Sequence, residues 1–229
     1  VGKFSEKDQR FVLINQKNRG PSAARNRGLG EANGDFVYFM DSDDYIAPET
    51  FEKCIKQFQM HSQLDIVLFD AAVVFEKKFL DKKSNVRHYD LSFASYYDRT
   101  IALDSNSVMT PYVYYKNSFD NSKFRGNICF CFIKKEIIDR ENVRFNENIT
   151  HYEDCLFFYQ ILRHLNCLKY LPERLYFRRM TGNSLMTSDQ NKKLVENILF
   201  VIQFIREMRI QLNPEELEIK KMFLHFLES

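Results

Sequence analysis

The stretch "VYFMDSDDYIAPE", Val37–Glu49, joins an apolar run to three aspartates that stand within four positions. The run 36–40 has the aromatic and β-branched residues that favour a strand. Pro48 suits the first position of a helix, whose apolar spacing continues to about Met60. A strand that ends in carboxylates and leads into a helix is typical of an α/β sheet, in which ligands bind at the carboxyl ends of the strands.

The same alternation of strands and helices continues on both sides of this stretch. We expect strands at 10–14, 36–40, 65–75, 127–133 and 167–176, and helices at 21–32, 48–60, 134–142, 154–166, 191–208 and 214–227. Residues 76–127 show no firm pattern. The sequence therefore predicts an α/β fold, a mainly parallel sheet flanked by helices, with one domain over 1–188 and a C-terminal helical segment over 189–229.

Composition excludes several classes of protein. A net charge of +2 on 229 residues gives no strong field toward nucleic acid, and we expect no nucleic-acid partner. Five cysteines without a CxxC pair favour reduced thiols in the cytoplasm, and we expect neither a signal peptide nor a segment that spans a bilayer. A zinc site of Cys129, Cys131 and His151 is an alternative, but its spacing matches no known ligand pattern.

The aspartates that end the strand suggest a metal site. Asp41 and Asp43 can point to the same side of an extended chain, and two close carboxylates repel unless a cation lies between them. Hard oxygen ligands suit Mg²⁺ or Mn²⁺, which keep positions open for phosphate oxygens. A turn that caps the next helix remains an alternative. A calcium loop fails, because Tyr45 and Ile46 stand where such a loop needs a polar ligand and a glycine.

A basic segment precedes the aspartates and contains four cations before the first acid at Glu31: Lys17, Arg19, Arg25 and Arg27. Gly20 and Pro21 begin a helix whose free N–H groups and dipole favour an anion. We expect Gly28 and Gly30 to let this helix pack closely. The alternative is a solvated basic face. Together the two segments describe a site for a nucleotide diphosphate and its cation.

Three motifs in order resemble the family 2 glycosyltransferases, which have the GT-A fold and use nucleotide-activated sugars. The first is "NRGPSAARNRGLGEANGDFVYFMDSDD" (18–44), which contains the family's SAARN and DSDD runs. The second is "VRFNENITHYEDCLFFYQIL" (143–162), similar to the segment that ends in Glu-Asp. The third is "LYFRRMTGNSL" (175–185), similar to the family's Tyr-x-Arg…Ser stretch.

The resemblance implies roles for residues that match the motifs. Asp154 matches the catalytic base, with Glu153 beside it. Asp43 matches the metal ligand, and Asp41 the aspartate that contacts ribose and supports the metal. The remaining substrate-binding matches are Arg25 and Asn26 at the nucleotide pocket, and Arg178 and Arg179 as a clamp on the diphosphate. Asp154 could instead be a helix N-cap, either clamp arginine could be a surface residue, and His151 is expected to be structural.

The resemblance also implies a reaction, the transfer of a sugar from a nucleotide-diphosphate sugar to an acceptor hydroxyl with inversion. The expected donor is a UDP-sugar, the cofactor Mn²⁺ or Mg²⁺, and the acceptor a glycan or lipid-linked precursor of bacterial surface polysaccharide. Family members normally begin with two nucleotide-binding strands, and we expect both to be absent here. The alternatives are therefore a piece of a longer enzyme or a non-catalytic remnant that binds a nucleotide sugar.

The apolar run 194–205 covers more of its helix than a single buried stripe requires. Its flanking cations suit a helix on anionic lipid, and they are Lys192, Lys193, Arg206 and Arg209. The alternative is a helix buried between the sheet and residues 214–227. We therefore expect this helix either to make a peripheral contact with the inner face of the cell membrane or to lie in the core of the protein.

Overall fold

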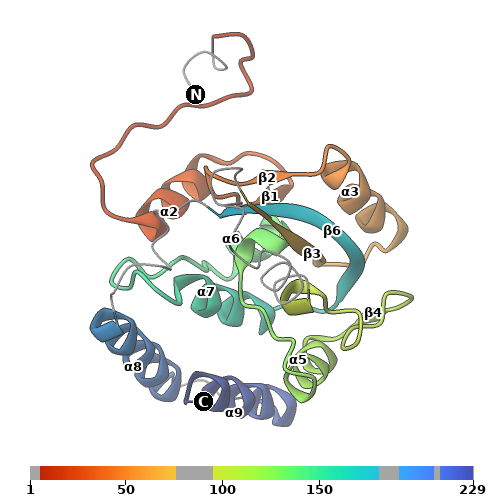
Figure 1. The fold of residues 1–229 in the computed structure, drawn as a ribbon, viewed down its shortest axis with the longest axis vertical. Coiled ribbons are helices and arrows are strands. Elements are labelled where there is room, and N and C mark those ends of the chain that lie inside the picture. The colour runs from red at the N-terminus through yellow and green to blue at the C-terminus, as the bar shows by residue number, and fades with distance from the viewer. Residues whose placement is uncertain (1–5, 76–94, 181–190, 209–211, 229) are drawn as a thin grey trace, which may run out of the picture.

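The computed structural model describes residues 6–75, 95–180, 191–208 and 212–228 (Figure 1). Its helices are α2 (Pro21–Glu31), α3 (Thr50–Met60), α5 (Pro111–Asp120), α6 (Lys135–Arg140), α7 (Glu153–Leu162), α8 (Asn191–Glu207) and α9 (Pro214–Glu228). Its strands are β1 (Phe36–Tyr38), β2 (Tyr45–Ile46), β3 (Ile66–Phe75), β4 (Val108–Met109), β5 (Cys131–Lys134) and β6 (Leu168–Met180). The predicted α/β alternation is confirmed.

The six strands form one sheet in the order β1-β5-β3-β6-β2, with β4 beside β6. Within the described residues only β3 and β6 pair in parallel, and the other pairings are antiparallel. The prediction of a mainly parallel sheet is therefore wrong for this part of the chain. The strand–helix–strand unit of β1, α3 and β3 does give two strands of one direction, but β5 lies between them and runs against both.

The predicted strand at 10–14 is also wrong. These residues have an irregular backbone, and the side chains of Phe11, Val12 and Leu13 are 51%, 69% and 48% exposed. A β-type sequence becomes a strand only where its N–H and C=O groups find a partner strand. No strand in the described part of the chain forms a ladder with this segment, which leads away from the body toward the N-terminus (Figure 1).

Two further differences have local causes. The predicted strand at 127–133 begins as a 3-10 turn, Ile128–Phe130, because the Asn127 side chain accepts a hydrogen bond from the Cys129 N–H at 2.8 Å. Helix α5 lies in the stretch to which the sequence assigned no element. It has an N-cap at Thr110, whose hydroxyl accepts from the Val113 N–H, and Pro111 follows as its first residue.

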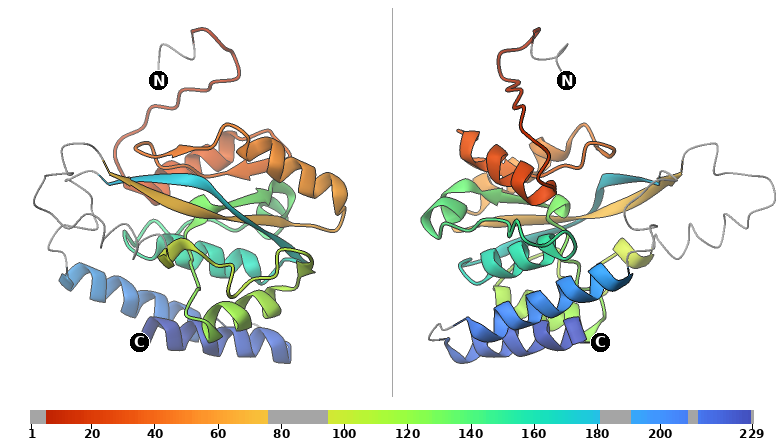
Figure 2. Two further views of the ribbon diagram at one scale, coloured as in Figure 1. Left: turned by 45° about the vertical axis from the view of Figure 1, so that its right-hand side comes forward. Right: turned by 90° about the vertical axis from the view of Figure 1, so that its left-hand side faces the viewer.

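The elements form layers on the two sides of the sheet (Figure 2). Helices α2 and α3 lie on one side, and α5 and α7 lie on the other, with α8 and α9 outside them (Figures 1 and 2). One hydrophobic core runs from β3 and β5 through α7 to Val201 of α8 and Phe223 of α9. The Phe223 ring stacks on Tyr159 with centroids 4.8 Å apart. The C-terminal helices thus share the core of the sheet.

Helix α8 has one face in that core and one face exposed. Val201 and Ile205 are fully buried, whereas Val195, Leu199 and Phe200 are 53%, 59% and 38% exposed. Among the described residues, none of the helices is both long enough and apolar enough to cross a bilayer.

Candidate functional site

The aspartate loop follows the carboxyl end of β1, as the sequence predicts. The Asp41 side chain is 44% exposed, and Asp43 is an exposed residue. The Asp44 N–H bonds to the Asp41 C=O at 3.2 Å, which closes the loop before β2 begins. The alternative of a cap on the next helix is not what forms, since α3 has Glu49 at its N-cap and no side-chain cap bond.

Arg25 brings the predicted site residues together. From α2 its guanidinium donates through Nη1 to Asp154 Oδ1 at 2.7 Å and to Glu153 Oε1 at 3.1 Å. Its Nη2 donates to Asp41 Oδ1 at 3.0 Å. Burial lowers the pKa of Arg25, but the carboxylates of Asp154 and Asp41 raise it by more, so its pKa lies above the ordinary value. One half-buried cation therefore joins the aspartate loop to the start of α7.

Asp154 lies in the first turn of α7, where the helix dipole favours carboxylates. Tyr152 is the N-cap residue and has a left-handed backbone, φ 62°, which a bulky residue rarely adopts. The helix has no side-chain cap bond, so the interpretation of Asp154 as an N-cap is wrong. Its carboxylate points instead to the Arg25 guanidinium.

The environment of Asp154 suits a proton acceptor. Burial raises the pKa of Asp154 to about 7, Arg25 opposes this rise, and the charges of Glu153 and Asp41 add to it. A backbone hydrogen bond from Ile128 favours the charged carboxylate. A base whose pKa lies near neutral can take a proton and still be ionised under ordinary conditions.

The Asn26 side chain hydrogen-bonds to the segment before α7. Its Oδ1 accepts from the Phe145 N–H at 2.8 Å, and its Nδ2 donates to the Phe145 C=O at 2.9 Å and to Glu147 at 3.1 Å. The Arg25 guanidinium lies over the Phe145 ring, 5.3 Å from its centroid. Asn26 therefore holds the segment before α7 against α2.

Arg179 and Tyr176 of β6 hold the aspartate loop through Asp44. The Asp44 carboxylate accepts from the Arg179 N–H at 2.7 Å and from the Tyr176 hydroxyl. The Arg179 side chain donates to the Asp43 C=O. Burial raises the pKa of Asp44 despite these donors. The sequence analysis missed Asp44 and Tyr176, although both stand inside motifs it quoted.

Arg178 is half-buried beside the same loop, on the strand residue that precedes Arg179. Its Nη1 donates to the Tyr97 hydroxyl at 3.0 Å. Burial lowers the pKa of Arg178, but Tyr97 and Asp44 more than offset this, and the pKa lies above the ordinary value. Of the two clamp arginines, Arg178 is thus partly buried and Arg179 is the one at the surface.

Two other cations of the basic segment, Arg19 and Arg27, form ion pairs at the surface. Arg19 bonds to Glu147 at 2.6 Å and Arg27 to Glu31 at 2.6 Å. A methyl group added at Gly28 or Gly30 would meet nothing within 4 Å, so these glycines are not required for close packing, contrary to the prediction.

Asp41 and Asp43 fit a hard divalent cation. Both carboxylates reach solvent and are oxygen ligands of the type that Mg²⁺ and Mn²⁺ take. The described residues contain no group of three acidic, histidine or cysteine side chains able to hold an ion. A cation on this loop would therefore complete its shell with donor phosphate oxygens or water.

Comparison with known proteins identifies the family. The model of glycosyl transferase family 2 matches residues 1–140, more than half of the chain. The chain belongs to glycosyl transferase family 2. Among curated relatives, an uncharacterized glycosyltransferase, EpsJ of Bacillus subtilis, is 28% identical over 184 residues, which are 80% of this chain and 48% of that protein. The minor teichoic acid biosynthesis protein GgaB of B. subtilis is 27% identical over 186 residues, 80% of this chain and 18% of that protein.

Solved structures show the same fold. The crystal structure of Staphylococcus aureus TarS 1–349 matches with a TM-score of 0.66 at 18% identity, over 99% of this family 2 chain and 57% of the TarS 1–349 chain. The structure of TarS 1–349 in complex with UDP-GlcNAc has a TM-score of 0.61 at 18% identity, over 93% of this chain and 54% of the TarS 1–349 chain.

The mannosyltransferase PcManGT of Pyrobaculum calidifontis, in complex with GDP-Man and Mn²⁺, matches with a TM-score of 0.54 at 16% identity, over 98% of this chain and 56% of that chain. The GT-A fold expected from the motifs is confirmed. This chain spans about half the length of EpsJ, of the TarS 1–349 chain and of PcManGT.

Proposed function

We propose that this glycosyltransferase transfers a sugar from a nucleotide-diphosphate sugar to an acceptor hydroxyl with inversion at the anomeric carbon. The observation that carries the proposal is the Arg25 bridge, which joins Asp41 of the DSDD loop to Asp154 of α7. A carboxylate with a pKa near 7 then lies beside the loop that suits a metal ion and its diphosphate.

In the proposed reaction Asp154 is the general base. It takes the proton of the acceptor hydroxyl while that oxygen bonds to the anomeric carbon, and the nucleoside diphosphate leaves from the opposite face with the bonding electron pair. A positioned base of this kind contributes about 10²–10⁴-fold to the rate. Arg25 holds Asp154 ionised and oriented, and Glu153 shares the same guanidinium.

Asp43 and Asp41 would hold Mn²⁺ or Mg²⁺. Such an ion supplies charge neutralisation to the departing diphosphate. Arg178 and Arg179 add positive charge beside the loop, and Asn26 keeps the segment before α7 in place. PcManGT, with its Mn²⁺, supports the choice of ion.

The proposed donor is a UDP-sugar, which the TarS complex with UDP-GlcNAc supports, and a GDP-sugar is the second choice. The proposed acceptor is a glycan or a lipid-linked precursor of bacterial surface polysaccharide, which the similarity to GgaB supports. Transfer of a sugar to such an acceptor would take place at the cytoplasmic face of the membrane. The exposed residues Val195, Leu199 and Phe200, with exposed Lys193 on the same helix, suit a peripheral contact there.

Titration calorimetry and a donor-turnover assay on the intact protein test the proposal. We expect UDP-GlcNAc or another nucleotide sugar to bind in the presence of Mn²⁺ and to lose most of its affinity in EDTA. Release of nucleoside diphosphate should depend on both the metal and the acceptor. Binding without any turnover would support a non-catalytic nucleotide-sugar-binding remnant, and failure of UDP- and GDP-sugars to bind would contradict both.

A further inference from the structure

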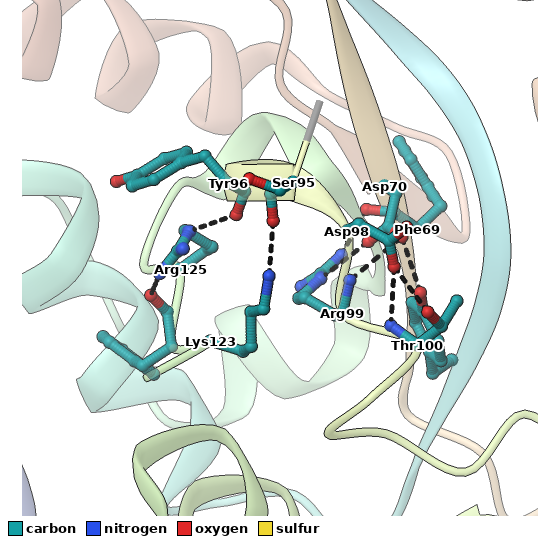
Figure 3. A network of polar contacts seen from close by, with 11 residues as sticks. Phe69, Asp70, Ser95, Tyr96, Asp98, Arg99, Thr100, Lys123 and Arg125 are labelled. Atoms are coloured by element: carbon teal, nitrogen blue, oxygen red, sulfur yellow. Dashed lines mark hydrogen bonds and ion pairs between the residues drawn. The ribbon is translucent and has the colours of Figure 1, made fainter. Parts of the chain in front are cut away.

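A buried ion pair lies outside the proposed catalytic site, under the middle of β3. The Arg99 Nε donates to Asp70 Oδ1 at 2.9 Å, and the two side chains are 1% and 4% exposed (Figure 3). Asp70 also accepts from the Arg99 N–H at 3.3 Å and from the Tyr170 hydroxyl at 2.6 Å. A buried pair is costly to desolvate, and this one compensates the cost with a full set of donors on its carboxylate.

The pair stands where the sheet is irregular. The register between β3 and β6 shifts at Asp70, so that Phe69 lies opposite Leu171 while Asp70 lies opposite Arg174. Arg99 donates to the Phe69 C=O through its Nη2. Because a register shift interrupts the ladder, Arg99 supplies a donor to the backbone at this place. The pair therefore fixes the segment that carries Arg99 to the centre of the sheet.

That segment carries Tyr97, two residues before Arg99, in a short helical turn at 95–97. The Tyr97 ring is 5% exposed and packs edge-to-face on Phe130, with centroids 5.3 Å apart. Its hydroxyl accepts the hydrogen bond from Arg178 Nη1 at 3.0 Å. Phe130 in turn packs on Tyr176, whose hydroxyl bonds to Asp44 of the DSDD loop.

The turn is also held from its other side. Arg125 Nε donates to the Tyr96 C=O at 2.8 Å, and its guanidinium lies 3.7 Å from the Tyr96 ring centroid. Lys123 donates to the Ser95 C=O (Figure 3). Lys123 and Arg125 of one loop bond to the turn, and the Arg99–Asp70 pair anchors the residues that follow it, so the backbone that carries Tyr97 is held on both sides.

We propose that Tyr97 is a positioning residue that orients Arg178 for the diphosphate of the donor, with the Arg99–Asp70 pair as its anchor. This inference rests on the proposed function, which assigns Arg178 to the diphosphate. A free arginine side chain has up to about 2 kcal/mol of rotamer entropy to lose on binding a ligand. A hydrogen bond to a fixed phenol removes much of that loss before the donor arrives. Tyr97 holds Nη1 of Arg178, and within the described residues the rest of the guanidinium makes no further hydrogen bond, which leaves it for phosphate oxygens.

The test is calorimetric titration of the intact protein with UDP, and with GDP in parallel, in the presence of Mn²⁺. The variants are Tyr97→Phe, Arg178→Ala and the double variant, with Tyr96→Phe as the matched control. Tyr96 is in the same turn but is 49% exposed. We expect Tyr97→Phe to weaken nucleotide binding about three- to tenfold, the size of the net contribution of one ordinary hydrogen bond. Tyr96→Phe should bind as the wild type does.

The double variant separates positioning from structure. If Tyr97 acts through Arg178, Tyr97→Phe has no further effect on affinity once Arg178 is alanine. Thermal melting of each variant checks that the fold is intact, and Tyr97→Phe keeps the ring that packs on Phe130.

Two results would overturn the inference: wild-type affinity in Tyr97→Phe while Arg178→Ala binds weakly, or effects of the two substitutions that simply add. Wild-type affinity in Arg178→Ala would instead remove Arg178 from the proposed donor site. Failure of the wild type to bind either nucleotide would contradict the proposed function and the inference together.

Discussion

At the scale of single residues, the Arg25 guanidinium explains how distant carboxylates form one site. Asp41 lies 16 residues from Arg25 in the sequence and Asp154 lies 129 residues away, yet both bond to it. The sequence identified the three side chains separately through motifs, and it assigned Arg25 to the nucleotide. That Arg25 bonds to the carboxylates depends on the packing of α2 near the start of α7, which no local pattern encodes.

Arg25→Met should therefore leave three carboxylates without their shared cation. We expect a loss of about 1–3 kcal/mol in the free energy of unfolding, the cost of partly buried polar groups without partners. The loss should be larger at pH 8 than at pH 5, because protonation of Asp154 relieves the repulsion at the lower pH. Urea unfolding at both pH values measures it. Arg27→Met, which removes an exposed pair, should change stability by less than about 0.5 kcal/mol, and an equal loss in both variants would contradict the account.

Asp43→Asn tests the metal assignment. Asp43 is exposed on its loop, so the melting temperature should stay at the wild-type value while Mn²⁺-supported binding of nucleotide is lost. Calorimetric titration with nucleotide in Mn²⁺ and in EDTA measures the affinity with and without the metal ion. Asp120→Asn, an exposed aspartate at the end of α5, is the control and should bind as the wild type does. Undiminished Mn²⁺-dependent binding in Asp43→Asn would show that the ion binds elsewhere.

At the scale of elements, the 121–127 loop lies close to the first turn of α7, which carries Asp154, the proposed base. A methyl group on Gly126 would lie 2.6 Å from Cys155 Sγ and 3.0 Å from Cys155 Cα. Cys155 directly follows Asp154, and Ile128 of the same loop region bonds to the Asp154 carboxylate. The loop therefore needs a glycine at this one place.

Gly126→Ala should push the first turn of α7 away from the loop. We expect a destabilisation of about 1–3 kcal/mol, as for other overpacked sites, and a fall in transfer rate that exceeds the fall in donor affinity. Gly30→Ala is the matched control, because its methyl group would meet nothing within 4 Å and it should raise helix stability by up to about 1 kcal/mol. Unfolding curves and steady-state kinetics give both quantities. Wild-type stability and transfer rate in Gly126→Ala would contradict this account, because the loop would then have moved to make room for the methyl group.

The elements also show how far sequence patterns reach. Helices α2, α3, α7, α8 and α9 were predicted within a few residues, since each has helical spacing or a proline at its start. Helix α5 could have been found from Thr110 and Pro111, an N-cap followed by proline. The run at 10–14 shows that residue type alone does not predict a strand. Its β-type residues have no partner strand among the described residues, and their backbone is irregular.

At the scale of the whole molecule, the direction of the strands could not be read from the sequence. Alternating strands and helices predicted parallel neighbours, but β5, which comes later in the chain, lies between β1 and β3 and runs against both. The order in which distant strands join a sheet depends on the packing of the completed core. The motifs predicted the family correctly, whereas the alternation of strands and helices did not predict the strand directions. The motifs lie in the loops at the strand ends and do not depend on which strands pair.

The exposed face of α8 belongs to this scale too, because it is part of the outermost layer. Removing 189–229 would expose the core residues around Val201 and Phe223, so substitutions at the surface make the better test. We expect weak, salt-sensitive sedimentation with anionic vesicles that the double variant Val195→Glu and Leu199→Glu abolishes. Leu217→Glu on α9, which is also exposed, is the control and should bind as the wild type does. Vesicle binding that survives the double variant would exclude this face as the contact.

The most direct test of the whole account is the comparison of Asp154→Asn with the wild type, in donor binding and in transfer, on the intact protein. The account predicts unchanged Mn²⁺-supported donor affinity and a transfer rate lower by at least about 10²-fold, because the variant lacks the base but keeps the shape of the side chain. Glu153→Gln, which alters the neighbouring carboxylate on the same guanidinium, should lower transfer far less. A wild-type transfer rate in Asp154→Asn, or an equal loss of binding and transfer, would contradict the assignment of Asp154 as the catalytic base.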